Sequence, residues 1–277
     1  MDKLNVRPSA VAGMFYPHDS KTLMKQVTEL LERAKPPKIK GELIALISPH
    51  AGYEYSGLTA AHGYKLLENK DYDVVVIISP SHQEYFKGVS AYPGVAYRTP
   101  LGDLSIDLEL QKEITEMSDL IVVSADGHGE EHAVEVQLPF LQTILDEFKI
   151  LPLIVGDQSK EICFELGKVL GKALIGKKAL IVASTDLSHY HPYDAAKKLD
   201  KIAIDDVAKY DYEKFMTDMD GHETEACGGG PAVAAMIAAK IMGANKSEIL
   251  HAVNSGDMTG EKGGVVGYMS AALYKSA

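Results

Sequence analysis

The chain has 277 residues, enough for one large α/β domain or two small ones. Its formal net charge of −11 excludes the basic surface that nucleic acids and anionic membranes require, so neither is expected as a partner. No apolar run approaches the roughly 18 residues that span a bilayer. The first seven residues contain no apolar signal-peptide core, and two cysteines are too few for a disulfide framework. Together these features predict a cytoplasmic protein.

Helices and strands are predicted to alternate along the chain. After an irregular start, Ser20 is predicted to cap a helix that runs to about Ala34. Three apolar runs without a polar break are typical of strands buried on both faces, as in a parallel sheet. These runs are Leu43–Ile47, Val74–Ile78 and Ala179–Ala183. Further helices are expected over 57–69, 107–117, 132–148 with an interruption near Pro139, 159–175, 193–210 and 231–242. Further strands are expected over 120–123, 150–155, 248–254 and 264–274, and short strands or an excursion over 88–102.

This alternation predicts one α/β domain over residues 1–277, with a mostly parallel central sheet and helices on both faces. A histidine follows each of the three buried strands. His50 and His82 come after short Ser/Pro segments, and His189 follows Asp186 by three residues. Because open α/β sheets bind ligands at the carboxyl ends of their strands, we expect these side chains to line one crevice.

Cys227 precedes three glycines and Pro231, a sequence that predicts a loop able to approach a ligand closely and then a helix. A thiol just before a helix N-terminus can have a lowered pKa. Imidazoles and a thiolate together favour Zn, Cu or Fe over Mg or Ca. The predicted metal ligands are therefore His50, His82 and Cys227; the alternative is a tight turn with an inert cysteine. Cys163 lies on an apolar helical stripe, where core packing is expected.

Asp186 and His189 are predicted to act in catalysis, because a histidine near a metal often transfers protons and a carboxylate can orient it. His132, at the start of a predicted helix, is a further candidate that could point at the same crevice. Residues 128–132 match the H-x-x-E-H pattern of metallopeptidases, but the glycines around His128 disfavour the helix which that chemistry needs. A hydrolase built on Ser184 lacks the Gly-x-Ser-x-Gly elbow. His62, His222 and His251 are expected to be structural or surface residues.

Taken in order, the motifs of this chain resemble those of the MEMO family, whose prokaryotic members are called AmmeMemoRadiSam system protein B. The resemblance covers nearly the whole chain and rests on Arg7-Pro8, Ala12–Pro17, Ser48–Tyr53, Ser79–His82, Glu131–Phe140, Ser184–Tyr190 and Cys227–Pro231. It implies a fold similar to the catalytic subunit of class III extradiol dioxygenases, in which two histidines and a glutamate hold Fe(II).

On this resemblance, His50 and His82 match the two metal histidines, and Cys227 stands where the carboxylate would be. His189, with Asp186, matches a catalytic histidine, and His132 is a candidate for another. Animal members of the family are described as copper-binding redox proteins. Because a thiolate replaces a hard oxygen ligand, we expect little or no ring cleavage of catechols.

Two functions are thus open. The first is a metal-dependent redox enzyme, related to non-haem dioxygenases, with Cu, Fe or Zn as cofactor and an unknown substrate. The second is a binding module that uses the same pocket to hold a peptide or small-molecule ligand without turnover. The resemblance also implies the proteins of the AmmeMemoRadiSam system as partners.

Overall fold

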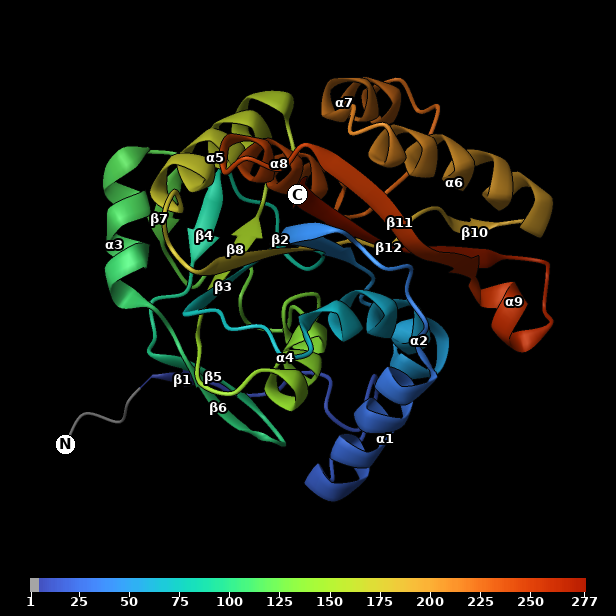
Figure 1. Ribbon diagram of the computed structural model, residues 1–277, viewed down its shortest axis with the longest axis horizontal. Helices are drawn as coiled ribbons and strands as arrows, with labels where there is room; N and C mark the ends of the chain where they lie inside the picture. Colours follow the sequence, from blue (N-terminus) through green and yellow to red (C-terminus); the bar gives the residue numbers. More distant parts are fainter. Residues whose placement is uncertain (1–4) are drawn as a thin grey trace.

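A nine-stranded sheet runs through the middle of the molecule (Figure 1), in the order β10-β12-β2-β9-β3-β8-β4-β7, with β11 paired to β12. The computed structural model describes residues 5–277. Residues 1–4, part of the segment from which the lack of a signal peptide was predicted, lie outside the described residues. The strands are β2 (Gly41–Ser48), β3 (Val74–Pro80), β4 (Val89–Ala91), β7 (Ile121–Val123), β8 (Lys149–Val155), β9 (Ala179–Ser184), β10 (His189–His191), β11 (Lys246–Asn254) and β12 (Val265–Ser276).

The four central strands β2, β9, β3 and β8 are parallel to one another, as their continuous apolar sequences predicted. The register places Ser48 beside Ser184, so β2 and β9 end at the same level. The flanks are antiparallel: β12 pairs with β2 and β11 on one side, and β4 pairs with β8 on the other. The sheet is therefore parallel where His50, His82 and Asp186 follow its strands, whereas His189 lies on the antiparallel strand β10.

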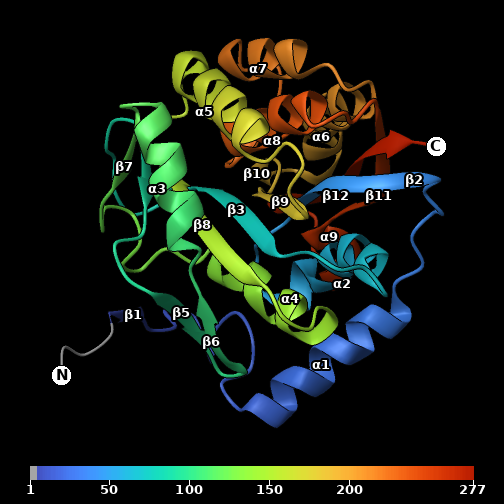
Figure 2. The ribbon, with the colours of Figure 1, turned by 60° about the vertical axis from the view of Figure 1, so that its left-hand side comes forward.

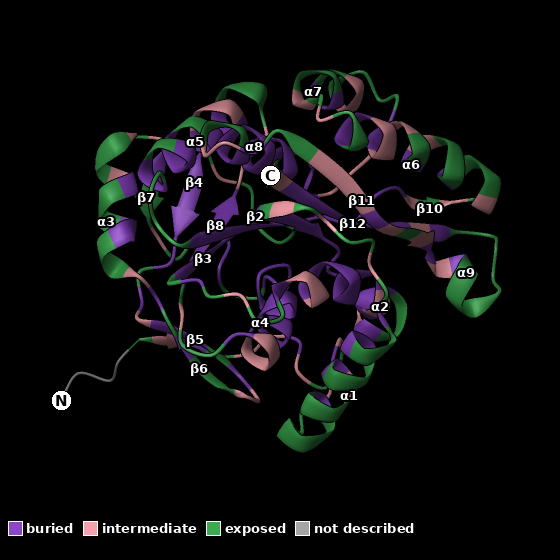
Figure 3. Ribbon diagram, viewed as in Figure 1, coloured by how far each residue is buried: buried purple, intermediate pink, exposed green. Residues whose placement is uncertain are grey.

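Helices cover both faces of the sheet (Figure 2). Successive residues of β3 point to opposite faces, so Val74, Val76 and Ile78 join one apolar core while Val75 and Ile77 join the other. This explains why β3 and β9 are buried at every residue, and β2 and β8 at all but their first residues (Figure 3). The first core packs under α3 (Leu108–Met117), α5 (Lys160–Ala173), α6 (Tyr193–Ala208), α7 (Tyr212–Asp220) and α8 (Gly229–Ile241), and the second under α1 (Ser20–Arg33), α2 (Tyr53–Tyr64) and α4 (Leu138–Ile144).

A three-stranded sheet of β1 (Val6–Arg7), β5 (Ala96–Thr99) and β6 (Gly102–Ser105) lies on the same side of the main sheet as α4. Strand β5, like β4 of the main sheet, falls in the region 88–102 where short strands or an excursion were expected. Three short helical elements complete the described chain: η1 (Lys65–Leu67), η2 (Glu135–Gln137) and α9 (Ser255–Thr259). Among the described residues, no helix combines the length and the apolar character needed to cross a membrane.

Several predicted boundaries were wrong. The helix expected over 132–148, with an interruption near Pro139, is shorter than predicted. It consists of η2 and α4, and Pro139 lies in the first turn of α4, where a helix tolerates its missing N–H. The first helix is capped by Asp19 rather than Ser20, since the Asp19 carboxylate accepts from Thr22 N at 2.8 Å. The helix predicted over 57–69 begins earlier, at Tyr53. Helices α7 and α9 were not predicted.

Candidate metal centre

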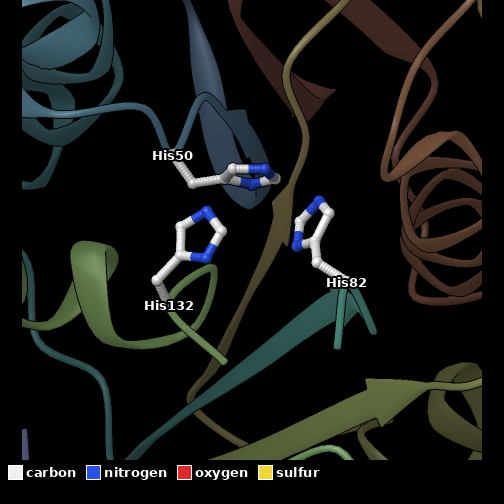
Figure 4. Close-up of side chains that lie close together, drawn as sticks. All are labelled: His50, His82 and His132. Atoms are coloured by element: carbon white, nitrogen blue, oxygen red, sulfur yellow. The ribbon is translucent and has the colours of Figure 1, made fainter. Parts of the chain in front are cut away.

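Three imidazole rings gather at the carboxyl edge of the parallel strands (Figure 4). His50 follows β2 and His82 follows β3, as predicted, and His132 comes from the loop between β7 and η2. One ring nitrogen from each histidine lies within 4.8 Å of the others, an arrangement that could hold a metal ion. The ring centroids are 4.9–5.3 Å apart. The structure thus places His132, predicted as a catalytic residue, in the same cluster as the two predicted metal histidines.

His50 is held by hydrogen bonds to its backbone N–H and to its ring, and it is only 2% exposed. Its backbone N–H donates to Asp186 Oδ1 at 2.8 Å, and its Nδ1 lies 2.9 Å from Ser184 Oγ. The Ser184 hydroxyl donates to the Ala133 carbonyl at 2.7 Å and accepts from Gln137 Nε2 at 2.8 Å. Because the single hydroxyl proton is used on that carbonyl, His50 Nδ1 must be the donor to Ser184. The lone pair of His50 Nε2 is then available to a metal.

Glu131 holds the other two histidines and is almost fully buried. Its Oε1 accepts from His82 Nδ1, from His132 N and from Ala133 N, each at 2.9 Å, and its Oε2 accepts from His82 N at 2.6 Å. A carboxylate on Nδ1 of a histidine fixes the ring and leaves Nε2 for a metal. Both oxygens of Glu131 are occupied by these donors, so this carboxylate serves to orient the histidines.

The surroundings favour neutral imidazoles at two of the three positions. Burial lowers the pKa of His50 well below its usual range, and the neighbouring histidines add to this effect. Burial also lowers the pKa of His132, although the charge of Glu131 opposes it. Burial acts on His82 in the same direction, but the hydrogen bond and charge of Glu131 outweigh it and raise the pKa of His82. Neutral imidazole is the form that binds metals.

Asp186 and Cys227 also contact His50, through its backbone N–H and its Nε2 respectively. Burial raises the pKa of Asp186 to about 7, against the hydrogen bond from His50 N. The Cys227 sulfur lies 3.2 Å from His50 Nε2, and the Asp186 N–H donates to it at 3.3 Å. The predicted lowering of the thiol pKa is wrong: burial and the charge of Asp186 raise the pKa of Cys227.

The glycines after Cys227 were predicted to let the loop approach a ligand closely. In the structure they let it approach other parts of the protein instead. A Cβ atom on Gly228 would lie 2.1 Å from the Ser184 carbonyl oxygen, and one on Gly230 would lie 2.6 Å from Cys163 Sγ. The loop is fixed by the Gln158 side chain, which donates to the Cys227 carbonyl at 2.7 Å and accepts from Gly230 N at 2.9 Å. This packing holds Cys227 against His50.

His189 lies farther from the three imidazoles, on β10. Burial lowers its pKa, and among the described residues no hydrogen bond joins it to the cluster. It lines a cavity of about 320 Å³ that reaches Cys227. The cavity is bordered by Leu187, His189, Met219, His222, Thr224, Glu225, Ala226 and Cys227. The Glu225 carboxylate is engaged by His191 Nε2, at 2.9 and 3.0 Å.

The remaining candidates have structural roles. His128 is buried in a loop, where its Nδ1 contacts the Tyr97 hydroxyl and its Nε2 lies 3.2 Å from the Ser90 carbonyl, so the metallopeptidase helix is absent. Cys163 is buried in the core, as predicted. His62 stacks on His251 with centroids 4.2 Å apart. No role in the site was predicted for Glu131 or Gln137, although both lie in the Glu131–Phe140 motif and Glu131 is the glutamate of the H-x-x-E-H pattern.

Comparison with known proteins agrees with the resemblance seen in the motifs. The sequence model of the Memo-like protein family matches residues 7–272. A MEMO1 family protein of Nitrosopumilus maritimus is 37% identical, over 95% of this chain and 98% of that protein. Another, of Methanobrevibacter smithii, is 36% identical over 96% and 98%. The crystal structure of the uncharacterized protein JW3007 from Escherichia coli K12 shares the fold, with a TM-score of 0.57 and 14% identity over 83% of this chain and 99% of that one. This chain therefore belongs to the Memo-like protein family.

Proposed function

We propose that this protein is a metal-dependent redox protein, related to the non-haem dioxygenases, whose metal is held by His50, His82 and His132. The observation that carries the proposal is the convergence of three imidazole nitrogens within 4.8 Å of one another. Ligands of a tetrahedral zinc ion lie about 3.4 Å apart, so the rings need only a small closing movement. Ser184 and Glu131 hydrogen-bond Nδ1 of His50 and His82, which directs their Nε2 atoms to the ion.

We further propose Cys227 as a fourth donor. The sequence predicted Cys227, not His132, as the third metal ligand. The Cys227 sulfur lies 3.2 Å from His50 Nε2, which supports Cys227 as a ligand in addition to the three histidines. Imidazole and thiolate donors suit Zn, Cu or Fe. A bound Cu or Fe ion would supply one-electron redox chemistry at this site, whereas Zn would supply a Lewis acid.

The cavity beside Cys227 supports a ligand at this centre. Its volume of about 320 Å³ is at the lower end of small-molecule sites. We propose that His189 contacts the ligand there and that Asp186, whose carboxylate holds the His50 backbone, moves a proton near the metal. The same cavity supports the second candidate function, a binding module for a small molecule or peptide without turnover. On the family resemblance, the AmmeMemoRadiSam proteins are the proposed protein partners.

Titration of the metal-free protein with Co²⁺ tests the ligand set. The Co²⁺ complex of the wild-type protein is expected to show the visible absorption bands typical of Co²⁺ with a low coordination number. It should also show a near-ultraviolet thiolate-to-metal charge-transfer band. Cys227→Ser should lose the thiolate band and bind more weakly, and His132→Ala should lose affinity while keeping that band. His222→Ala, which changes a histidine of the cavity wall, serves as the control. Wild-type protein that binds no Co²⁺, Zn²⁺ or Cu⁺ would overturn the proposed function, and an unchanged spectrum in Cys227→Ser would remove Cys227 from the site.

A further inference from the structure

Arg7 is a buried arginine that donates hydrogen bonds to the loop carrying His132. It lies in β1 and is 2% exposed. Its Nε donates to the His128 carbonyl at 2.8 Å, and its Nη2 donates to the carbonyls of Gly129, at 3.2 Å, and of Glu131. These three carbonyls belong to a stretch without helix or strand, so no ladder partner is available to them.

The loop is also tied to the N-terminal segment through Glu135, which is fully buried. Glu135 pairs with Arg7 Nη1 and accepts hydrogen bonds from Ala10 N at 2.7 Å, from Val11 N at 3.0 Å and from the Tyr16 hydroxyl. Arg7 and Glu135 thus clamp residues 128–135 at both ends. Glu131, which holds His82, is itself bonded to Arg7 through its carbonyl, and His132 lies between Glu131 and Glu135.

The same N-terminal segment reaches the site itself. The ring of Phe15 packs edge-on against His132 with centroids 4.8 Å apart, and the Phe15 carbonyl accepts from Tyr53 N at 2.8 Å. Tyr53 opens α2, three residues after His50. Residues 7–16 therefore contact the loop of His132 from one side and the turn after His50 from the other.

We propose that Arg7 is a positioning residue for the metal centre, acting through the backbone of residues 128–131 on His132 and Glu131. The inference rests on the proposed metal-binding function. An arginine suits this task because its planar guanidinium presents five donors in a fixed fork, whereas lysine offers three on a single flexible point. If Arg7 served only to neutralise the buried charge of Glu135, lysine would replace it.

Arg7→Lys separates these two roles. Lysine keeps the positive charge beside Glu135 but cannot reach three carbonyls and the carboxylate together. The control is Arg98→Lys on the neighbouring strand β5, where the exposed arginine forms two hydrogen bonds of 2.7 and 2.8 Å with Asp103 and does not touch the loop. If Arg7→Lys does not fold, Arg7→Gln combined with Glu135→Gln removes the buried charges together.

Two measurements are made on each variant. The first is hydrogen exchange of the His132 and Ala133 amides, which donate to Glu131, in the metal-free protein. The second is Zn²⁺ affinity by competition with a chromophoric chelator. In Arg7→Lys we expect exchange at these amides to accelerate and Zn²⁺ affinity to fall by about tenfold, the lower end of the effect of outer partners on metal sites. Arg98→Lys should change neither.

The possible results separate a failure of the positioning role of Arg7 from a failure of the proposed metal-binding function. Faster exchange in Arg7→Lys with a wild-type protein that binds no Zn²⁺ would overturn the metal-binding function while retaining Arg7 as the residue that positions the loop. Unchanged exchange, or faster exchange with unchanged Zn²⁺ affinity, would overturn the positioning role in the metal centre.

Discussion

Replacing Glu131 with glutamine is expected to loosen the metal centre while leaving the fold in place. The carboxylate accepts four hydrogen bonds, two from His82, one from His132 N and one from Ala133 N. In Glu131→Gln the amide oxygen can still accept the three that now reach Oε1. The amide nitrogen, however, would face His82 N, which donates to Oε2 at 2.6 Å, so donor would oppose donor.

In Glu131→Gln, one of these four hydrogen bonds is lost. Loss of one buried hydrogen bond to a charged group costs about 1.5–3 kcal/mol of unfolding free energy. The remaining bonds become neutral, and the charge that raises the pKa of His82 disappears. A carboxylate that orients metal-binding histidines contributes about 10–100-fold to metal affinity, so Zn²⁺ binding should weaken by that factor.

Urea unfolding of the metal-free protein and Zn²⁺ competition measure the two effects. The matched control is Glu130→Gln, which removes the same charge from an exposed neighbour and should change unfolding free energy by no more than about 0.5 kcal/mol. If Glu131→Gln behaved like Glu130→Gln in both assays, Glu131 would not organise the site.

Three further predictions follow from the site. His189→Ala should leave the melting temperature nearly unchanged but alter ligand binding or turnover in the cavity that His189 lines; failure to fold would indicate a packing role instead. Iron-reconstituted protein given catechols anaerobically and then oxygen should form little ring-opened product, because the proposed ligands are three imidazoles and a thiolate rather than two imidazoles and a carboxylate. Rapid yellow product that is lost in His50→Ala would contradict this. Burial lowers the pKa of His128 to about 4. The unfolded chain therefore binds a proton near pH 6.5 and the folded protein only near pH 4, and unfolding free energy should fall with decreasing pH in this window by up to about 1.4 kcal/mol per pH unit. His128→Gln should fall less steeply in urea titrations, and parallel curves would refute the assignment.

The amino-acid sequence by itself determined the centre of the fold and two members of the site. The apolar runs that became β2, β3 and β9 have no polar break, so they could only be buried on both faces in a parallel sheet. Parallel strands end at one edge of the sheet, which is why His50 and His82 could be placed together from their positions after β2 and β3 alone.

Only the tertiary structure decided which side chains complete the cluster. His132 comes from a loop with no periodic pattern, and that loop is positioned by Arg7, which bonds to a carbonyl 121 residues away. Likewise Glu225 could have faced the histidine cluster, but its carboxylate contacts His191, whereas the Cys227 sulfur contacts His50. The pleat of a strand makes its side chains point alternately to the two faces of the sheet. The direction of a loop side chain instead depends on distant contacts that no local sequence pattern encodes.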